Sequence, residues 1–172
     1  MKDSGLALRE ELERILEMWS KTGVPTRSGF ESAAKELIAW REENDIPGLW
    51  ADSPLFMTAT LDDGWGHGLS LIHLYAEVVG LQIEQIGLLQ SAEKIVSECH
   101  ATPPDILGLT VLQFDTEDDL IRVTDSLPLK TIVIAGGPVF AADPDFAQRS
   151  GIHYVARNAA HFLKLMLKIK TF

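Results

Sequence analysis

The sequence predicts an α/β fold in which a parallel sheet follows a pair of helices. From residue 55 onward, short apolar runs rich in β-branched residues alternate with helical patterns. This alternation is typical of a doubly wound sheet whose strands are joined by right-handed crossovers. The runs 106–112 and 131–135 are almost wholly apolar, as strands in the buried middle of a parallel sheet are. We expect a flavodoxin-like (Rossmann-like) five-stranded parallel sheet with a short N-terminal helical hairpin.

The hairpin is predicted from two helical patterns near the N-terminus. Leu6 to Trp19 carries its apolar residues on or near one face. A second helix is expected from about Phe30 to Glu43, with Ser28 as its N-cap, before a linker with two prolines. We therefore divide the chain into an N-terminal helical segment, 1–52, and an α/β domain, 53–172. The hairpin is too short for a four-helix bundle of its own, so we expect it to pack on the α/β domain or on a second copy in a homodimer.

The remaining elements follow from the same patterns. Strands are expected at 56–61, 81–86, 106–112, 131–135 and 153–155. Helices are expected at 69–79, 91–100, 117–126, 143–149 and 159–169, with Thr116 as the N-cap of the third. Because the carboxyl ends of parallel strands share one edge of the sheet, the loops that leave them surround one crevice. These loops are 62–68, 87–90, 110–115 and 136–138.

Composition excludes several classes of protein. The formal net charge is −10, and an acidic chain is a poor non-specific partner for nucleic acid. Cys99 is the only cysteine, which excludes an intramolecular disulfide and a thiolate metal cluster and fits a reducing compartment. No apolar run reaches membrane-spanning length, and the N-terminal apolar residues are interleaved with charges, unlike a signal peptide. We expect a cytoplasmic protein with neither a nucleic-acid nor a membrane partner.

The loop after the first strand is acidic and rich in glycine, but it does not match a nucleotide-binding motif. The chain contains no GxxxxGK[ST] sequence. The spacing Gly64-x-Gly66-x-Gly68 differs from GxGxxG, and the neighbouring Asp62 and Asp63 would repel a pyrophosphate. The sequence therefore favours a different ligand at this edge.

Three short motifs follow the expected strands in order. Asp63 and Gly68 are separated by four residues, Thr110 and Leu112 by one, and Gly136-Gly137 ends the fourth strand. From Leu55 to the C-terminus, this pattern resembles the cobalamin (vitamin B12)-binding domain family, which includes methionine synthase, methylmalonyl-CoA mutase and corrinoid methyl-carrier proteins. The family motifs are DxHxxG, SxL and GG. In this chain threonine replaces the serine, and Trp65 stands where the histidine is expected.

The resemblance implies a corrinoid (cobalamin) lying over the carboxyl ends of the strands. In the family, the nucleotide tail passes the SxL hydroxyl and the GG backbone, and the histidine, steadied by the aspartate, coordinates cobalt. The implied cofactor-binding residues are Asp63, Trp65, Gly68, Thr110, Leu112, Gly136 and Gly137. Indole cannot ligate cobalt, because its nitrogen is a donor only. His67 is the alternative metal ligand, with Asp62 or Asp63 as its hydrogen-bond partner.

We interpret the chain as a corrinoid carrier or sensor module that lacks the usual histidine ligand. It would have no catalytic residue of its own, and methyl transfer would need a partner methyltransferase; a regulatory protein is the other expected partner. Two alternatives remain open. Some relatives of this fold bind haem, and His67 or His100 would then be an axial ligand. The chain would otherwise be a ligand-free regulatory or interaction domain in which Trp65 fills the vacated site.

At the level of single residues, simpler interpretations also stand. Asp62 and Asp63 would be turn and capping acids at the start of a helix. Gly136-Gly137 would be only a tight exit from a strand. Thr110 would be an ordinary β-branched strand residue.

Overall fold

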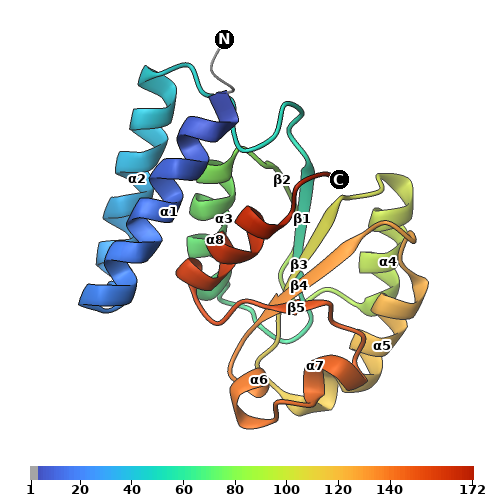
Figure 1. Cartoon of the computed structure of the whole chain (residues 1–172). Coiled ribbons are helices and arrows are strands. Elements are labelled where there is room, and N and C mark those ends of the chain that lie inside the picture. Colours follow the sequence, from blue (N-terminus) through green and yellow to red (C-terminus); the bar gives the residue numbers. More distant parts are fainter. Residues whose placement is uncertain (1–3) are drawn as a thin grey trace. The chain divides into compact units, whose positions relative to one another are not determined.

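The computed structural model describes residues 4–172 and contains one five-stranded parallel sheet. The strands are β1 (Leu55–Thr60), β2 (Gln82–Gly87), β3 (Ile106–Thr110), β4 (Ile132–Gly136) and β5 (Tyr154–Val155). Their order is β2-β1-β3-β4-β5, the flavodoxin-like order that the sequence predicted (Figure 1). In the register of the central pairs, Ala59 faces Leu109 and Leu109 faces Ala135. Each predicted strand overlaps an observed one.

Helices alternate with these strands along the chain. They are α1 (Ser4–Thr22), α2 (Arg27–Glu43), α3 (His67–Val79), α4 (Ala92–Ala101), α5 (Glu117–Ser126), α6 (Val139–Ala142), α7 (Phe146–Arg149) and α8 (Ala159–Lys168). A 3₁₀ turn, η1 (Phe114–Thr116), precedes α5. No helix described between residues 4 and 172 is long and apolar enough to cross a membrane.

Three local predictions need correction. The cap of α2 is Thr26, whose side chain accepts a hydrogen bond from the amide of Gly29 at 3.2 Å, so the helix begins before Ser28. Thr116 is the N-cap residue of α5, as predicted, but its side chain makes no capping hydrogen bond, because its hydroxyl donates to the Gln113 carbonyl within the η1 turn, at 2.8 Å. The helix expected at 143–149 is α7, which begins only at Phe146, and the short helix α6 before it was not predicted. Asp143 lies between them in an extended conformation, as a residue before a proline prefers.

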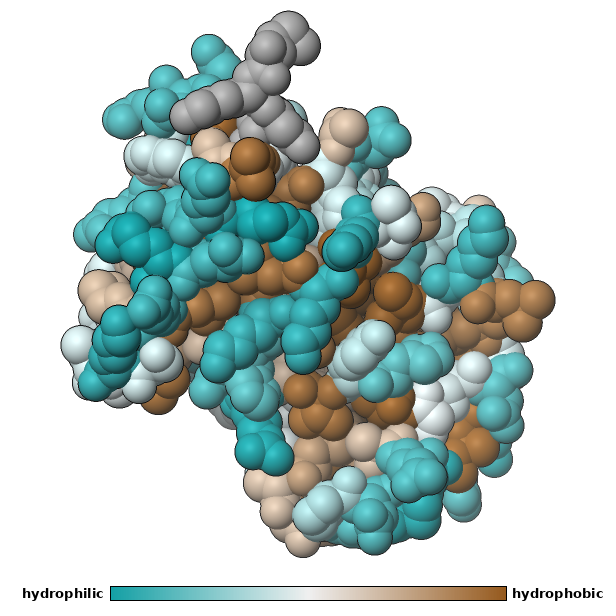
Figure 2. All heavy atoms as spheres, in the orientation of Figure 1, coloured by the Kyte–Doolittle hydropathy of each residue, from teal (hydrophilic) through white to brown (hydrophobic). Residues whose placement is uncertain are grey.

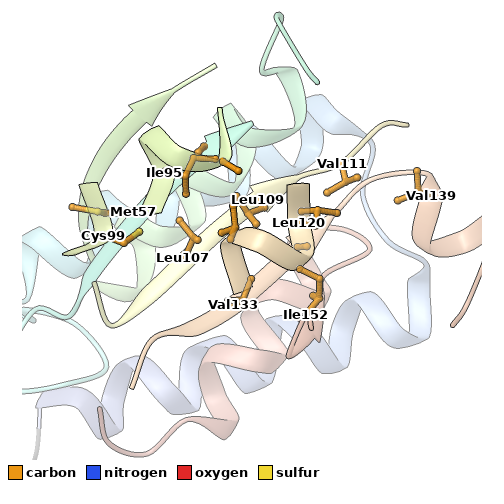
Figure 3. Packing of buried hydrophobic residues seen from close by; sticks show 14 of the residues in the cluster. Met57, Ile95, Cys99, Leu107, Leu109, Val111, Leu120, Val133, Val139 and Ile152 are labelled. Atoms are coloured by element: carbon orange, nitrogen blue, oxygen red, sulfur yellow. The ribbon is translucent and has the colours of Figure 1, made fainter. Parts of the chain in front are cut away.

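One compact unit comprises Leu55–Ser70 and Ile83–Arg157. Alternate residues of β1, β3 and β4 point to one face of the sheet, where they pack against apolar residues of α4 and α5 (Figure 3). This core includes Met57, Leu107, Leu109, Val133, Ile95, Cys99, Leu120 and Val123. Residues Ile106 to Leu109 of β3 are all buried, as the apolar run predicted for a central strand.

The other compact unit comprises the N-terminal residues to Pro54 together with Leu71–Gln82 and Asn158–Phe172. Trp19 of α1, Phe30 of α2 and Tyr75 of α3 pack edge to face, with ring centroids 5.2–6.5 Å apart. The Tyr75 hydroxyl donates to the Phe30 carbonyl at 2.9 Å, and burial raises the pKa of this tyrosine. The outer side of α1 is mostly hydrophilic, as its amphipathic pattern requires (Figure 2).

The helical hairpin therefore packs on helices that come later in the chain. The Arg9 guanidinium of α1 donates to the Leu167 carbonyl of α8 at 2.6 Å, and the Trp50 indole donates to the Ile169 carbonyl at 3.2 Å. The hairpin thus packs on α3 and α8, two helices of the predicted α/β domain. The domain boundary between residues 52 and 53 stays a prediction.

Candidate functional site

The loops that leave β1, β2 and β3 are joined to one another by hydrogen bonds at the carboxyl edge of the sheet. Thr60, the last residue of β1, is fully buried and joins the first two. Its hydroxyl donates to the Asp63 carbonyl of its own loop and accepts from the Leu89 amide of the β2 loop at 2.9 Å. The Thr60 carbonyl accepts from the Gln90 amide at 2.8 Å. A single threonine therefore sets the position of two loops.

Asp62 connects the β1 loop to the β3 loop. Its carboxylate accepts hydrogen bonds from the amide of Leu112 at 3.0 Å and from the amide of Gln113 at 2.8 Å. Bonds from backbone amides to a charged acceptor are stronger than bonds between neutral groups. Asp62 thus does more than shape its own turn, because it holds a loop 50 residues further along the chain.

Asp63 folds the loop that carries Trp65. It is 5% exposed, and its Oδ1 accepts from the amides of Trp65 at 2.8 Å and Gly66 at 3.1 Å. This is the Asx-turn arrangement, in which an aspartate bonds the backbone two residues further on. The turn projects the Trp65 side chain into solvent, where it is 81% exposed. The sequence placed Asp63 and Trp65 at one motif, and the structure brings them together in this turn.

His67 is the first residue of α3 and is exposed. Its ring lies nearly parallel to the Trp65 indole, with 7° between the planes and 6.2 Å between the centroids. Among residues 4–172, no group of three or more histidine, cysteine, aspartate or glutamate side chains is placed to hold a metal ion. His67 therefore does not belong to a cluster of three or more such side chains in the described residues.

His100 lies away from this edge. It is in the last turn of α4, a helix that starts after the β2 loop and ends before β3 begins. Such a crossover helix runs back to the amino ends of the strands. The His100 Nε2 lies 2.6 Å from the Ser126 carbonyl oxygen at the end of α5. His67 and His100 thus belong to opposite edges of the sheet.

The glycine pair after β4 is explained by the backbone around it. A Cβ atom on Gly137 would lie 1.9 Å from the Val111 carbonyl oxygen, and one on Gly136 would lie 2.9 Å from the Ala156 carbonyl oxygen. The Val111 amide also donates to the Gly136 carbonyl at 2.9 Å. Both glycines are therefore required for the β3 and β5 segments to approach β4, whatever else the pair does. Thr110 is half-buried beside this contact.

Gly68 is different from every other glycine in the chain. A Cβ atom built on it meets nothing within 4 Å, and its backbone is not in the left-handed region. Each of the other glycines has either a left-handed backbone or an atom within 4 Å of the added carbon. Alanine, a better helix former than glycine, would fit at this position without a clash. The packing of this chain therefore gives no reason for glycine at position 68.

Apolar side chains gather at the same edge. Five of the large hydrophobic residues that are exposed lie in the loops after β1, β2 and β3: Trp65, Leu88, Leu89, Leu112 and Phe114. Large exposed apolar patches mark places where a ligand or another protein binds. Trp65 and Leu112 were predicted from the motifs, whereas Leu88, Leu89 and Phe114 were not. The available signal was a leucine pair in a loop, where polar residues are usual.

Solved structures of similar fold exist, whereas no protein-family model and no curated protein matches the chain. A novel cobalamin-binding protein from Desulfitobacterium hafniense DCB-2 is similar over 93% of this chain and 78% of its own, with a TM-score of 0.75 and 18% identity. The monomethylamine corrinoid protein of Methanosarcina barkeri is similar over 81% of this chain and 65% of its own, with a TM-score of 0.61 and 20% identity.

A chain of the methanol:cobalamin methyltransferase complex MtaBC, also from Methanosarcina barkeri, is similar over 93% of this chain and 63% of its own. Its TM-score is 0.62 and its identity 20%. This chain spans less than two thirds of the length of both Methanosarcina chains. The resemblance read from the motifs is thus confirmed at the level of the fold: the chain has the α/β fold of these cobalamin-binding and corrinoid proteins.

Proposed function

We propose that the chain binds a corrinoid at the carboxyl edge of its sheet and acts as a carrier or sensor, without a histidine ligand to cobalt. Proteins of the same fold are described as cobalamin-binding or corrinoid proteins. The observation that carries the proposal is the exposed Trp65 at the motif histidine position, held out by the Asp63 turn. A side chain of this size and exposure provides an apolar surface where the family places a metal ligand.

The chemistry of the edge fits such a group. A corrin ring is a broad macrocycle with largely apolar faces, and the exposed side chains of Trp65, Leu112 and Phe114 offer apolar contact area. A Cβ atom added to Gly68 would meet nothing within 4 Å, so the chain leaves open space at this position. When bound, a corrinoid supplies a cobalt centre that can carry a methyl group. The residues of this chain would bind the ring, orient it and exclude water from one of its faces.

The nucleotide tail is assigned to Thr110, Gly136 and Gly137 by the family resemblance. In this chain the Val111 carbonyl already lies against Gly137. A tail would therefore have to pass beside this contact or displace it. Cobinamide, a corrinoid without the nucleotide tail, separates the two contributions. Tail binding predicts tighter retention of hydroxocobalamin than of cobinamide, and ring binding alone predicts equal retention.

The test is retention of hydroxocobalamin by the full chain after desalting, read from the visible spectrum. We expect retained corrin bands that are the same in His67→Ala and in the control His100→Ala, since the latter changes a histidine at the opposite edge. Trp65→His should shift the bands toward those of an imidazole-ligated corrinoid. Loss of the bands in the unchanged protein would refute corrinoid binding. A spectral shift in His67→Ala alone would refute the absence of a histidine ligand.

Two further proposals concern haem and partners. Haem is the alternative ligand, but the similar structures give it no support. Its test is retention of haemin by the full chain after desalting, read from the visible spectrum. A partner methyltransferase is proposed because one similar chain comes from a methyltransferase complex. A homodimer through α1 and α2 also remains a proposal. The mass of the purified chain in solution distinguishes a dimer from a monomer.

A further inference from the structure

We propose that Leu88 and Leu89 of the β2 loop contact the corrinoid directly and form one apolar platform with Trp65. Thr60 is the positioning residue that holds this platform in place. The inference rests on the proposed function and adds residues that the motif resemblance does not contain.

The two leucines lie against the residues on either side of Trp65 in the chain. A Cβ atom on Gly64 would lie 3.2 Å from a methyl carbon of Leu89, and one on Gly66 would lie 3.0 Å from a methyl carbon of Leu88. Gly64 and Gly66 are the chain neighbours of Trp65. The β2 loop therefore lies directly against the turn that projects the indole. Leu88, Leu89 and Trp65 are all exposed on these two adjoining loops, and they are here called the leucine–tryptophan platform.

The backbone of Leu89 is held in an unfavourable conformation. Its φ is +52°, and the only other residue besides glycine with a positive φ in residues 4–172 is Asp45. Aspartate tolerates the left-handed region, whereas leucine rarely adopts it. Leu89 is nevertheless 62% exposed, so burial in the core does not compensate for this conformation. Strained backbone of this kind is concentrated at ligand-binding sites, where its cost is offset by function.

Thr60 accounts for how the conformation is maintained. The Leu89 amide donates to the Thr60 hydroxyl at 2.9 Å, and the next amide, of Gln90, donates to the Thr60 carbonyl at 2.8 Å. Two consecutive amides are thus anchored to the buried end of β1. The anchoring fixes the direction of the Leu89 side chain relative to Trp65. A rigid apolar surface loses little conformational entropy when a flat ligand binds to it.

The variant Leu89→Asn tests the inference. Asparagine tolerates the left-handed region, so the loop should keep its backbone conformation while the apolar contact is lost. Corrinoid affinity should fall about five- to twenty-fold, the loss expected when a largely exposed leucine can no longer be covered by a ligand. The melting temperature should stay unchanged or rise. Leu129→Asn is the matched control, because Leu129 is fully exposed in the loop before β4, at the opposite edge of the sheet.

Affinity is measured by titrating the full chain with cobinamide and with hydroxocobalamin. A drop in affinity for both probes in Leu89→Asn, with Leu129→Asn equal to the unchanged protein, supports the inference. Unchanged affinity in Leu89→Asn overturns it while leaving corrinoid binding intact. If the unchanged protein binds neither probe, the proposed function fails and the inference fails with it. A fall in melting temperature with unchanged affinity would show that Leu89 is only structural, and would also overturn it.

Discussion

Removing the Thr60 hydroxyl should loosen two loops at once, and Thr60→Val does so with little change of volume. The variant loses the hydrogen bond to the Asp63 carbonyl and the bond from the Leu89 amide. Two such bonds contribute about 2 kcal/mol to the free energy of unfolding, and a partly buried amide is left without its acceptor. For a chain of this size, we expect the melting temperature to fall by about 4–8 °C. Amide exchange at Leu89 should accelerate.

Thr60→Ser is the matched control, because it keeps the hydroxyl and removes only a buried methyl group. That loss should cost about 1 kcal/mol, and the Leu89 amide should stay protected from exchange. Both variants are compared by calorimetry and by hydrogen exchange at single amides. If Thr60→Val were as stable as Thr60→Ser, with equal protection at Leu89, then Thr60 would not be what connects the two loops.

Two other predictions concern Asp62 and Cys99. In Asp62→Ala the amides of Leu112 and Gln113 lose their acceptor, so limited proteolysis should cut the β3 loop faster than in the unchanged protein. Asp62→Asn keeps one acceptor oxygen and should show about half of this increase. Equal cleavage of the two variants would contradict this role of Asp62. Burial raises the pKa of the Cys99 thiol to about 11, so the folded chain keeps this proton where the unfolded chain loses it. Stability should therefore fall as the pH rises from about 9 towards 11, measured by urea unfolding, and Cys99→Ala should remove that part of the pH dependence.

The order of the strands could be predicted because it depends on local patterns and on few allowed topologies. Apolar runs identified β3 and β4 as buried strands, short crossovers left few topologies, and the flavodoxin-like order chosen among them is the one observed. The end of β3 was less predictable. The apolar run continues through Leu112, but the strand ends at Thr110, because the Leu112 amide turns to the Asp62 carboxylate. Hydropathy alone cannot distinguish an apolar residue in a strand from one in a binding loop.

The connections within the site could not be predicted from the sequence. Thr60 bonds to Leu89 and Asp62 bonds to Leu112, and both contacts join residues that are distant in the chain. No spacing rule relates such pairs, because the sheet brings them together only after β1 has paired with its neighbours. Threonine at the end of a strand also has an ordinary explanation in its β-branched shape. Its role became visible only when the partners of its hydroxyl were known.

The residues at this edge of the sheet fall into two groups with different physical explanations. Asp63 and Gly137 are accounted for by the chain itself, since one folds a turn and the other admits a carbonyl oxygen. Contacts within the chain do not explain Gly68, Trp65 and Leu89. Gly68 has room for a side chain, Trp65 is exposed, and Leu89 is exposed with a left-handed backbone. A chain of marginal stability can keep such residues where a ligand supplies the missing contacts. The second group is therefore what points to a ligand at this edge, and substitutions there should weaken corrinoid binding without unfolding the protein.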